Sequence, residues 1–136
     1  MDVEGVRGFV RSNHRAVLAT RRKDGSPQMS PVTVAVGPDG RLRISTRETA
    51  MKTRNVRRDP RVSLCLLTDG FFGDWAQAEG TAEVVELPEA MDLLVEYYKA
   101  VAGEHPDWDD YRAAMERERR VMLLVDVMRA GPNVSG

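Results

Sequence analysis

One stretch near the middle of the chain changes from helical to extended character; it has the sequence Met51-Lys52-Thr53-Arg54-Asn55-Val56-Arg57-Arg58-Asp59-Pro60-Arg61-Val62-Ser63-Leu64. Helical spacing places Met51, Asn55 and Arg58 on one face of a helix over residues 48–58. Pro60 restricts the residue before it, so the helix is expected to end near Asp59. The apolar run over 62–68 then predicts a strand buried on both faces, or nearly so.

On both sides of this stretch, short apolar or alternating runs separated by turn residues predict five more strands. Asp24-Gly25 and Pro38-Asp39-Gly40 supply two of the turns. The six predicted strands cover residues 16–20, 28–36, 41–46, 62–68, 75–87 and 120–127. Pro31 lacks a backbone N–H, so the second strand should have an irregularity or an unpaired edge there. The alternation over 41–46 is typical of a strand with one solvated face.

Helices are predicted on both sides of these strands. They cover residues 1–13, a stretch that begins at Pro88 and has its apolar face between Leu93 and Val101, and residues 108–117. Residues 128–136 are expected to form a loose tail. The pattern predicts one domain over residues 1–136, mainly β with flanking helices. Six sequential antiparallel strands favour a small barrel over an open sheet.

Composition excludes several classes of protein. The chain has 136 residues, a formal net charge of −1 and 42% hydrophobic residues, which is too apolar for a disordered chain. No apolar run approaches a membrane span, and the first residues lack a secretory signal pattern. One cysteine and two distant histidines provide no disulfide framework and no metal-ligand spacing. These features predict a cytoplasmic domain without a metal and without a membrane partner.

Charge is distributed unevenly along the chain. Residues 41–61 contain eight basic residues and two acids, a net charge of +6, whereas residues 83–118 contain eleven acids and three basic residues, a net charge of −8. This asymmetry indicates one anion-attracting surface and one solvated acidic face, although two ordinary charged surfaces remain the alternative. The near-neutral total argues against nucleic-acid binding, which would have to use the basic cluster.

The strongest candidate site lies in the basic segment. Ser45 and Thr46 end a predicted strand, and Lys52 lies near the start of the helix that follows. Hydroxyl groups, free amide N–H groups and cationic side chains together form a good phosphate site. The alternative is a basic helix on the surface. No nucleophile or acid–base pair is evident in the sequence, and Cys65 fits a buried structural thiol.

The segment 51–64 resembles the signature of the flavin/deazaflavin oxidoreductase superfamily, whose members share the split β-barrel of pyridoxamine 5′-phosphate oxidase, also called the FMN-binding split barrel. Further similarity lies in residues 17–20, 24–28 and 78–82. Residues 102–112 are similar to the actinobacterial B group, which binds coenzyme F-420, a 5-deazaflavin with an oligoglutamate tail. The resemblance extends from about Val6 to Val127.

This resemblance implies a homodimer with the cofactor in a groove between subunits. The cofactor phosphate would lie at the segment that contains Met51, held by Lys52 with Ser45, Thr46, Thr53 and Asn55, and Arg58 would reach the acidic tail. The deazaflavin ring would be lined by Gln28, Met29, Ser30, Pro31 and Val32. Trp75 and Gln77 would approach from the other subunit. Relatives often have Asn at the position of Pro31 and an aromatic residue at that of Gln77, so the substrate side of the groove differs here.

The implied function is that of an F-420-dependent reductase, in which reduced deazaflavin donates a hydride to a small electron-poor organic substrate. The cofactor carries the difficult step, so the protein needs no nucleophile of its own. No residue is assigned a catalytic role. Two alternatives remain: an FMN-binding oxidoreductase of the same fold, and a non-catalytic protein that binds or carries F-420.

Overall fold

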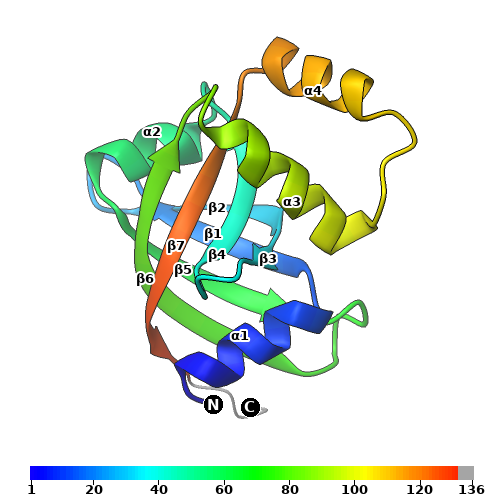
Figure 1. The fold of residues 1–136 in the computed structure, drawn as a ribbon. Helices are drawn as coiled ribbons and strands as arrows, with labels where there is room; N and C mark the ends of the chain where they lie inside the picture. Colours follow the sequence, from blue (N-terminus) through cyan, green and yellow to red (C-terminus); the bar gives the residue numbers. More distant parts are fainter. Residues whose placement is uncertain (132–136) are drawn as a thin grey trace.

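A curled antiparallel sheet forms the body of the protein, shown in Figure 1 as a computed structural model that describes residues 1–131. The sheet order is β2-β1-β5-β6-β7-β4-β3. The elements are α1 (Val3–Ser12), β1 (Arg15–Arg21), β2 (Pro27–Thr33), β3 (Ala35–Val36), β4 (Leu42–Arg47), α2 (Met51–Arg58), β5 (Arg61–Leu67), β6 (Trp75–Val85), α3 (Ala90–Ala102), α4 (Trp108–Arg117) and β7 (Arg120–Ala130). The predicted class, mainly β with flanking helices in a split barrel, is confirmed.

The described residues contain seven strands instead of six, because the predicted strand over 28–36 is divided. Val34 separates β2 from β3, and its N–H donates to the carbonyl of His14. Its side chain is fully buried in the core. After this break the chain pairs with β4 instead of β1. The break thus places β2 and β3 at opposite edges of the same sheet.

The main core fills the inside of the curled sheet. Alternate residues of the strands point inward, among them Leu18, Ile44 and Leu64, each no more than 1% exposed. Helix α1 adds Val6 and Val10 to this core, with Asp2 as its N-cap. In Figure 1, α1 and α2 lie at opposite ends of the sheet. The sheet thereby buries its concave side and closes at both ends.

Strand β5 differs from the prediction that both its faces are buried. Val62, Leu64 and Leu66 are buried, whereas Ser63, Cys65 and Leu67 on the other face are only half-buried. The reason is that no helix of the described chain covers this outer face; α3 and α4 lie over the other half of the sheet (Figure 1). Cys65 is a free thiol on that face and not a core residue.

Strand β4 also differs from its prediction. The face that was expected to be solvated is covered by α3, and Arg43 on it is only 5% exposed. A second apolar cluster fills the space under α3 and α4, including Leu94, Tyr111 and Met122. The alternating pattern identified the strand correctly, but it does not show that a helix 50 residues later packs over the polar face.

Strand β7 continues to Ala130, so residues 128–130 are not part of a loose tail as predicted. A β-bulge at Glu79/Gly80 lets β6 and β7 continue their pairing beyond Val127. A side chain at Gly80 would meet the carbonyl oxygen of Asp126 at 1.9 Å, so only glycine permits this approach. Residues 132–136, the rest of the predicted tail, lie outside the described residues.

The helix ends mostly follow the prediction. Helix α2 begins at Met51 instead of Glu48. The N–H of Glu48 donates to the carbonyl of Arg119, just before β7, and the N–H of Ala50 donates to the carbonyl of Arg47 in the turn before the helix. It ends at Arg58, as Pro60 requires. Over residues 1–131, no helix is both long and apolar enough to cross a membrane.

Candidate functional site

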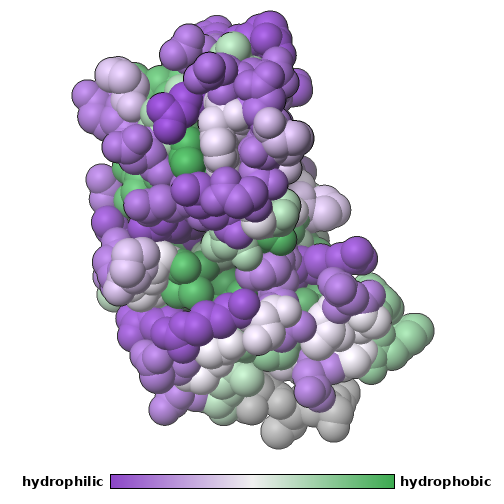
Figure 2. Space-filling view, turned by 45° about the vertical axis from the view of Figure 1, so that its right-hand side comes forward, coloured by the Kyte–Doolittle hydropathy of each residue, from purple (hydrophilic) through white to green (hydrophobic). Residues whose placement is uncertain are grey.

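The curl of the sheet brings β2 and β4 close together without pairing them, and a cavity of about 510 Å³ lies at this seam. We call it the seam cavity. Strands β2 and β4, helices α2, α3 and α4 and the start of β7 all contribute to it. Its lining consists of Pro31, Val32, Thr33, Ser45, Thr46, Lys52, Tyr97, Tyr98, Tyr111, Met115 and Arg120. Figure 2 shows apolar side chains in hollows of one face of the molecule, between ridges of polar side chains.

Lys52 is the residue in the seam cavity best suited to bind an anion. Its Nζ donates to the hydroxyl of Ser30 at 3.1 Å, and no carboxylate of residues 1–131 lies within ion-pair distance of it. Burial, together with the positive charge of Arg120, lowers the pKa of Lys52 below its ordinary value. Two cations held near one another in a partly buried cavity repel, and a bound anion relieves that repulsion.

Arg120 differs from Lys52 because it already has an acidic neighbour. Its Nε and one Nη donate to the same oxygen of Glu118, at 3.1 and 2.8 Å. Arg47 approaches that oxygen at 3.5 Å. Both arginines lower the pKa of Glu118, and the hydrogen bond from Arg120 has the larger effect. One carboxylate is shared by two guanidinium groups, so this side of the cavity also has a net positive charge.

The first turn of α2 contributes backbone donors beside Lys52. Ala50 is the N-cap residue and makes no side-chain hydrogen bond to the helix. Thr53 and Arg54 both donate their N–H groups to the carbonyl of Ala50, which leaves the N–H groups of Met51 and Lys52 without a partner within the helix. A phosphate or carboxylate at this end of α2 would therefore meet N–H groups as well as the ammonium group of Lys52.

Strand β2 is an edge strand with backbone groups that face away from β1. Arg22 donates its N–H to Ser26, and Val34 donates to His14, so the residues that bond to β1 alternate with residues that face the free edge. Met29, Pro31 and Thr33 belong to the second set. The carbonyl of Thr33 accepts the Tyr97 hydroxyl at 3.0 Å. The unpaired edge predicted at Pro31 is confirmed, and its proline blocks pairing with another strand there.

A match to a family model covers residues 3–130 and is described as pyridoxamine 5′-phosphate oxidase. The chain belongs to this family. A conserved hypothetical protein from Mycobacterium tuberculosis, Rv2991, is 28% identical, with a TM-score of 0.77 over 100% of this chain and 92% of its own.

Two solved structures of lower identity share the fold. One is named an F420 reductase, with 20% identity and a TM-score of 0.70 over 92% of this chain and 94% of its own. The other is the heme storage protein HutZ from Vibrio cholerae, with 15% identity and a TM-score of 0.73 over 98% of this chain and 96% of its own. The same fold therefore occurs in proteins with different ligands.

The structure brings six of the predicted site residues together at the seam: Ser30, Pro31, Val32, Ser45, Thr46 and Lys52. Gln28 and Met29 precede them on β2, where Met29 is 64% exposed. Met51 begins α2 and is 53% exposed, but it does not line the cavity. The segment predicted to line the ring and the segment predicted to hold the phosphate, which are separate in the sequence, thus meet at one place.

Thr53 and Asn55 were predicted to hold the phosphate, but their side chains are buried and point elsewhere. Thr53 is fully buried and donates its hydroxyl to the carbonyl of Arg47 at 2.7 Å. Asn55 is 1% exposed and donates its amide to the hydroxyl of Thr20 at 3.1 Å. Arg58 donates to the Asn55 side chain and to the carbonyl of Arg21. Thr53 thus fastens α2 to the end of β4, and Asn55 and Arg58 fasten it to β1, because one face of an eight-residue helix must point into the protein.

Trp75 and Gln77 lie on the outer face of the sheet, away from the seam cavity of their own chain. Four residues on four neighbouring strands form one row across the sheet. Gln77 of β6 pairs with Cys65 of β5, Cys65 pairs with Val17 of β1, and Val17 pairs with Pro31 of β2. The row therefore spans four strands, each about 4.8 Å from the next. Within one chain, neither Trp75 nor Gln77 lines the seam cavity.

Sequence reasoning missed the residues that α3, α4 and β7 contribute to the seam. They are Tyr97, Tyr98, Tyr111, Met115 and Arg120. Tyr97 and Tyr98 were recognised only as part of an apolar helix face. Two adjacent side chains on a helix point about 100° apart, so two neighbouring tyrosines cannot both lie at the centre of its apolar face. This spacing could have indicated that one of them has another role.

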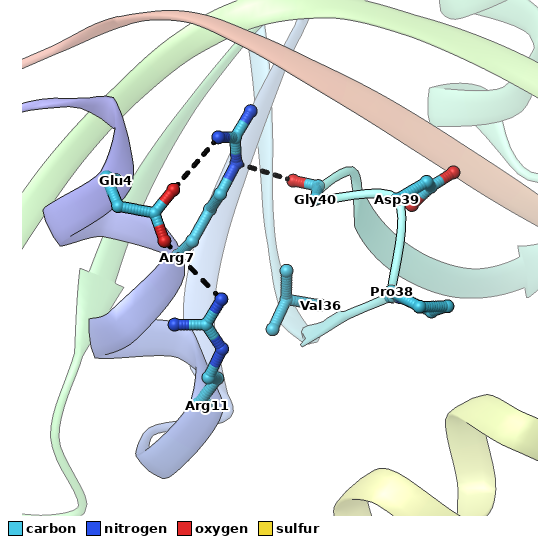
Figure 3. A pocket seen from close by; sticks show the side chains of 8 residues that line it. Glu4, Arg7, Arg11, Val36, Pro38, Asp39 and Gly40 are labelled. Carbon is cyan, nitrogen blue, oxygen red and sulfur yellow. Dashed lines mark hydrogen bonds and ion pairs between the residues drawn. The ribbon is translucent and has the colours of Figure 1, made fainter.

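A second hollow, of about 470 Å³, lies between α1 and the turn before β4 (Figure 3). Arg7 donates to the carbonyl of Gly40 at 3.0 Å and forms an ion pair with Glu4, which also approaches Arg11. Each of these two cations thus has an acidic partner within the protein, unlike Lys52. Over residues 1–131, no group of three or more His, Cys, Asp or Glu residues could hold a metal ion.

Proposed function

We propose that this protein binds coenzyme F-420 at the seam and acts as a reductase on a small electron-poor organic substrate. The observation that carries the proposal is Lys52, a partly buried cation beside Arg120 that has no carboxylate of residues 1–131 within ion-pair distance. A cavity that retains an uncompensated positive charge suits a ligand that carries negative charge.

The residues at the seam fit the cofactor that the family implies. Lys52 with Ser45, Thr46 and the first amides of α2 would bind the phosphate. The free backbone edge of β2 at Met29 and Pro31 would face the polar edge of the ring. When bound, the deazaflavin supplies the hydride. The protein's part is to bind and orient the ring and to exclude water from the reacting face.

The choice of F-420 over FMN rests on the excess of cations. FMN also has a phosphate, but the oligoglutamate tail of F-420 adds further negative charge. Three cations of residues 41–61, namely Lys52, Arg54 and Arg58, form no ion pair within residues 1–131. The similarity to an F420 reductase supports the fold for such a function, and the family match equally supports FMN. A carrier protein would need the same cavity and would differ only by the absence of turnover.

We also propose that two copies form a homodimer through the outer face of β2, β1, β5 and β6. This face is free of helices and exposes apolar or weakly polar side chains, including Val17, Cys65 and Trp75. At its edge, Phe71 is 72% and Phe72 is 97% exposed. A face of this kind is typical of a protein interface. In such a dimer, Trp75 and Gln77 would be available to the partner's cofactor groove.

A fluorescence titration with oxidised F-420 and, separately, with FMN tests the cofactor assignment. We expect F-420 to bind more tightly, and Lys52→Met to weaken it at least tenfold because one charge-assisted contact is lost. Arg54→Met removes one cation from the exposed side of the same helix and serves as the matched control. In the unaltered protein, affinity should fall as the pH rises toward the lowered pKa of Lys52, since the ammonium group then loses its charge.

Three results would count against the proposal. Tighter binding of FMN assigns the protein to the flavin alternative. Equal weakening by both substitutions means that general charge, and not Lys52, attracts the ligand. Binding of neither cofactor rejects the function and leaves only the fold.

A further inference from the structure

The seam cavity has two chemically different parts, which meet where Arg120 lies near Lys52 and where the Tyr97 hydroxyl lies near the Ser45 backbone; we call them its Lys52 end and its aromatic end. One contains Lys52, Ser45 and Thr46, which the proposed function assigns to the cofactor. The other is formed by Tyr97 and Tyr98 of α3 and by Tyr111 and Met115 of α4, with Arg120 of β7 on the same lining. This second end combines aromatic and thioether groups with a guanidinium group. Binding of the cofactor phosphate does not explain the presence of the aromatic and thioether groups.

The aromatic end is held in place by its own hydrogen bonds. The Tyr111 hydroxyl donates to the carbonyl of Leu94 at 2.8 Å, and the Tyr97 hydroxyl donates to the carbonyl of Thr33. Burial raises the pKa of both phenols, that of Tyr111 to about 12, so both remain donors. Because these hydroxyls are used within the protein, the two rings present mainly carbon to the cavity.

Ring packing fixes the remaining aromatic group. Tyr98 packs against Tyr111 with ring centroids 5.1 Å apart, and it also contacts His105 and Trp108 at 5.0 and 5.7 Å. Aromatic pairs at such distances stabilise one another beyond simple burial. The end of the cavity is therefore a preorganised surface suited to a flat ring.

Among the described residues that line this end, Arg120 is the only charged one. Its side chain is 27% exposed, and the Glu118 carboxylate that it binds is shared with Arg47. A planar guanidinium group binds carboxylates through paired hydrogen bonds. A ligand carboxylate can replace Glu118 at Arg120, because Glu118 then keeps Arg47 as its partner.

We propose that the Tyr98–Arg120 end of the seam cavity binds the substrate, and that this substrate is a flat, conjugated carboxylate. Its ring system lies against Tyr98, Tyr111 and Met115, and its carboxylate binds Arg120. The identification as substrate rests on the proposed function, which places the cofactor at the Lys52 end. The ligand class rests on the lining of the cavity alone.

The test measures binding of 2-naphthoate to the full-length protein by titration calorimetry, with 2-naphthylmethanol as its uncharged analogue. We expect Arg120→Gln to weaken naphthoate at least tenfold and to leave the alcohol unchanged, because a charge-assisted contact is lost only for the acid. Tyr98→Leu should weaken both ligands. Arg112→Gln, on an exposed position of α4, is the matched control. Circular dichroism establishes that each variant is folded.

A second series separates this inference from the cofactor assignment. Lys52→Met should weaken F-420 at least tenfold and should weaken naphthoate less than Arg120→Gln does, because Lys52 lies near Arg120 but is not the group that binds the ligand carboxylate. The proposal is overturned if naphthoate fails to bind, if Arg120→Gln binds it like the unaltered protein, or if its affinity depends on Lys52 and not on Arg120. If F-420 does not bind while naphthoate still depends on Arg120, the proposed function fails and the ligand class stands.

Discussion

Neighbouring residues of α2 differ in role: one faces the seam cavity, and the others attach the helix to the sheet. Lys52 faces the seam cavity, whereas Thr53 and Asn55 are buried and hold the helix against the sheet. The Asn55 amide donates to Thr20, and its oxygen accepts from Arg58. Removal of such a side chain leaves buried polar groups without partners, which is costly. A short motif can therefore combine ligand contacts with the contacts that position them.

This division of tasks predicts a stability effect at Asn55. Asn55→Ala should lower the free energy of unfolding by about 2 kcal/mol, because Thr20 and Arg58 lose a buried partner. Arg54→Ala, on the exposed side of the same helix, should change it by less than about 0.5 kcal/mol. Urea unfolding measures both. A variant with unchanged stability and weakened cofactor binding would instead identify Asn55 as a direct ligand contact.

At the scale of elements, the strands and α2 were predictable because their signals are local. The division of 28–36 at Val34 was not, since it depends on which strand each half pairs with. The burial of the polar face of β4 was not predictable either, because the helix that covers it, α3, lies far along the sequence. Lys52 and Ser30 could be nominated from the sequence with the help of a family resemblance. Arg120 could not, because only the pairing of β4 with β7 brings it to Ser45 and Lys52.

The contact between α3 and β4 predicts an unusual order of stabilities. Arg43 has a side chain only 6% exposed; it donates to Glu96 of α3 at 2.7 Å, and its Nε has no hydrogen-bond partner among residues 1–131. Glu96 is 57% exposed, so water partly compensates its charge. Glu96→Gln should destabilise the protein by about 1 kcal/mol, because the buried guanidinium group loses its counter-ion. Arg43→Met should be neutral or stabilising, because it removes the buried charge itself.

A double-mutant cycle in urea checks this order. Once Arg43 is replaced by Met, Glu96→Gln should have no further effect on the free energy of unfolding. If Arg43→Met is the more damaging single change, the guanidinium group contributes packing and hydrogen bonds that outweigh the cost of burying it.

At the scale of the whole molecule, the sheet is covered unevenly. The main core fills its concave side, and helices cover both its ends and the outer faces of β4 and β7. No helix of residues 1–131 covers the outer face of β2, β1, β5 and β6. Val17 lies in the middle of that open face, between Pro31 and Cys65 on the adjacent strands. The seam cavity opens beside the same strands, so an interface here would bring the partner's Trp75 and Gln77 positions toward the ligand.

We therefore expect Val17→Lys to convert the proposed dimer to a monomer. A charge on this face would have to be buried against the second copy without a partner, which strongly disfavours association. Sedimentation equilibrium should show a mass near twice 15.2 kDa for the unaltered protein and near 15.2 kDa for the variant. Ala113→Lys adds the same charge at an exposed position of α4 and should remain dimeric. If the groove is shared between subunits, the Val17 variant should also bind F-420 more weakly while its thermal unfolding remains cooperative. A variant that is monomeric but binds F-420 with full affinity would place the whole site within one chain, and a monomeric unaltered protein would reject the interface.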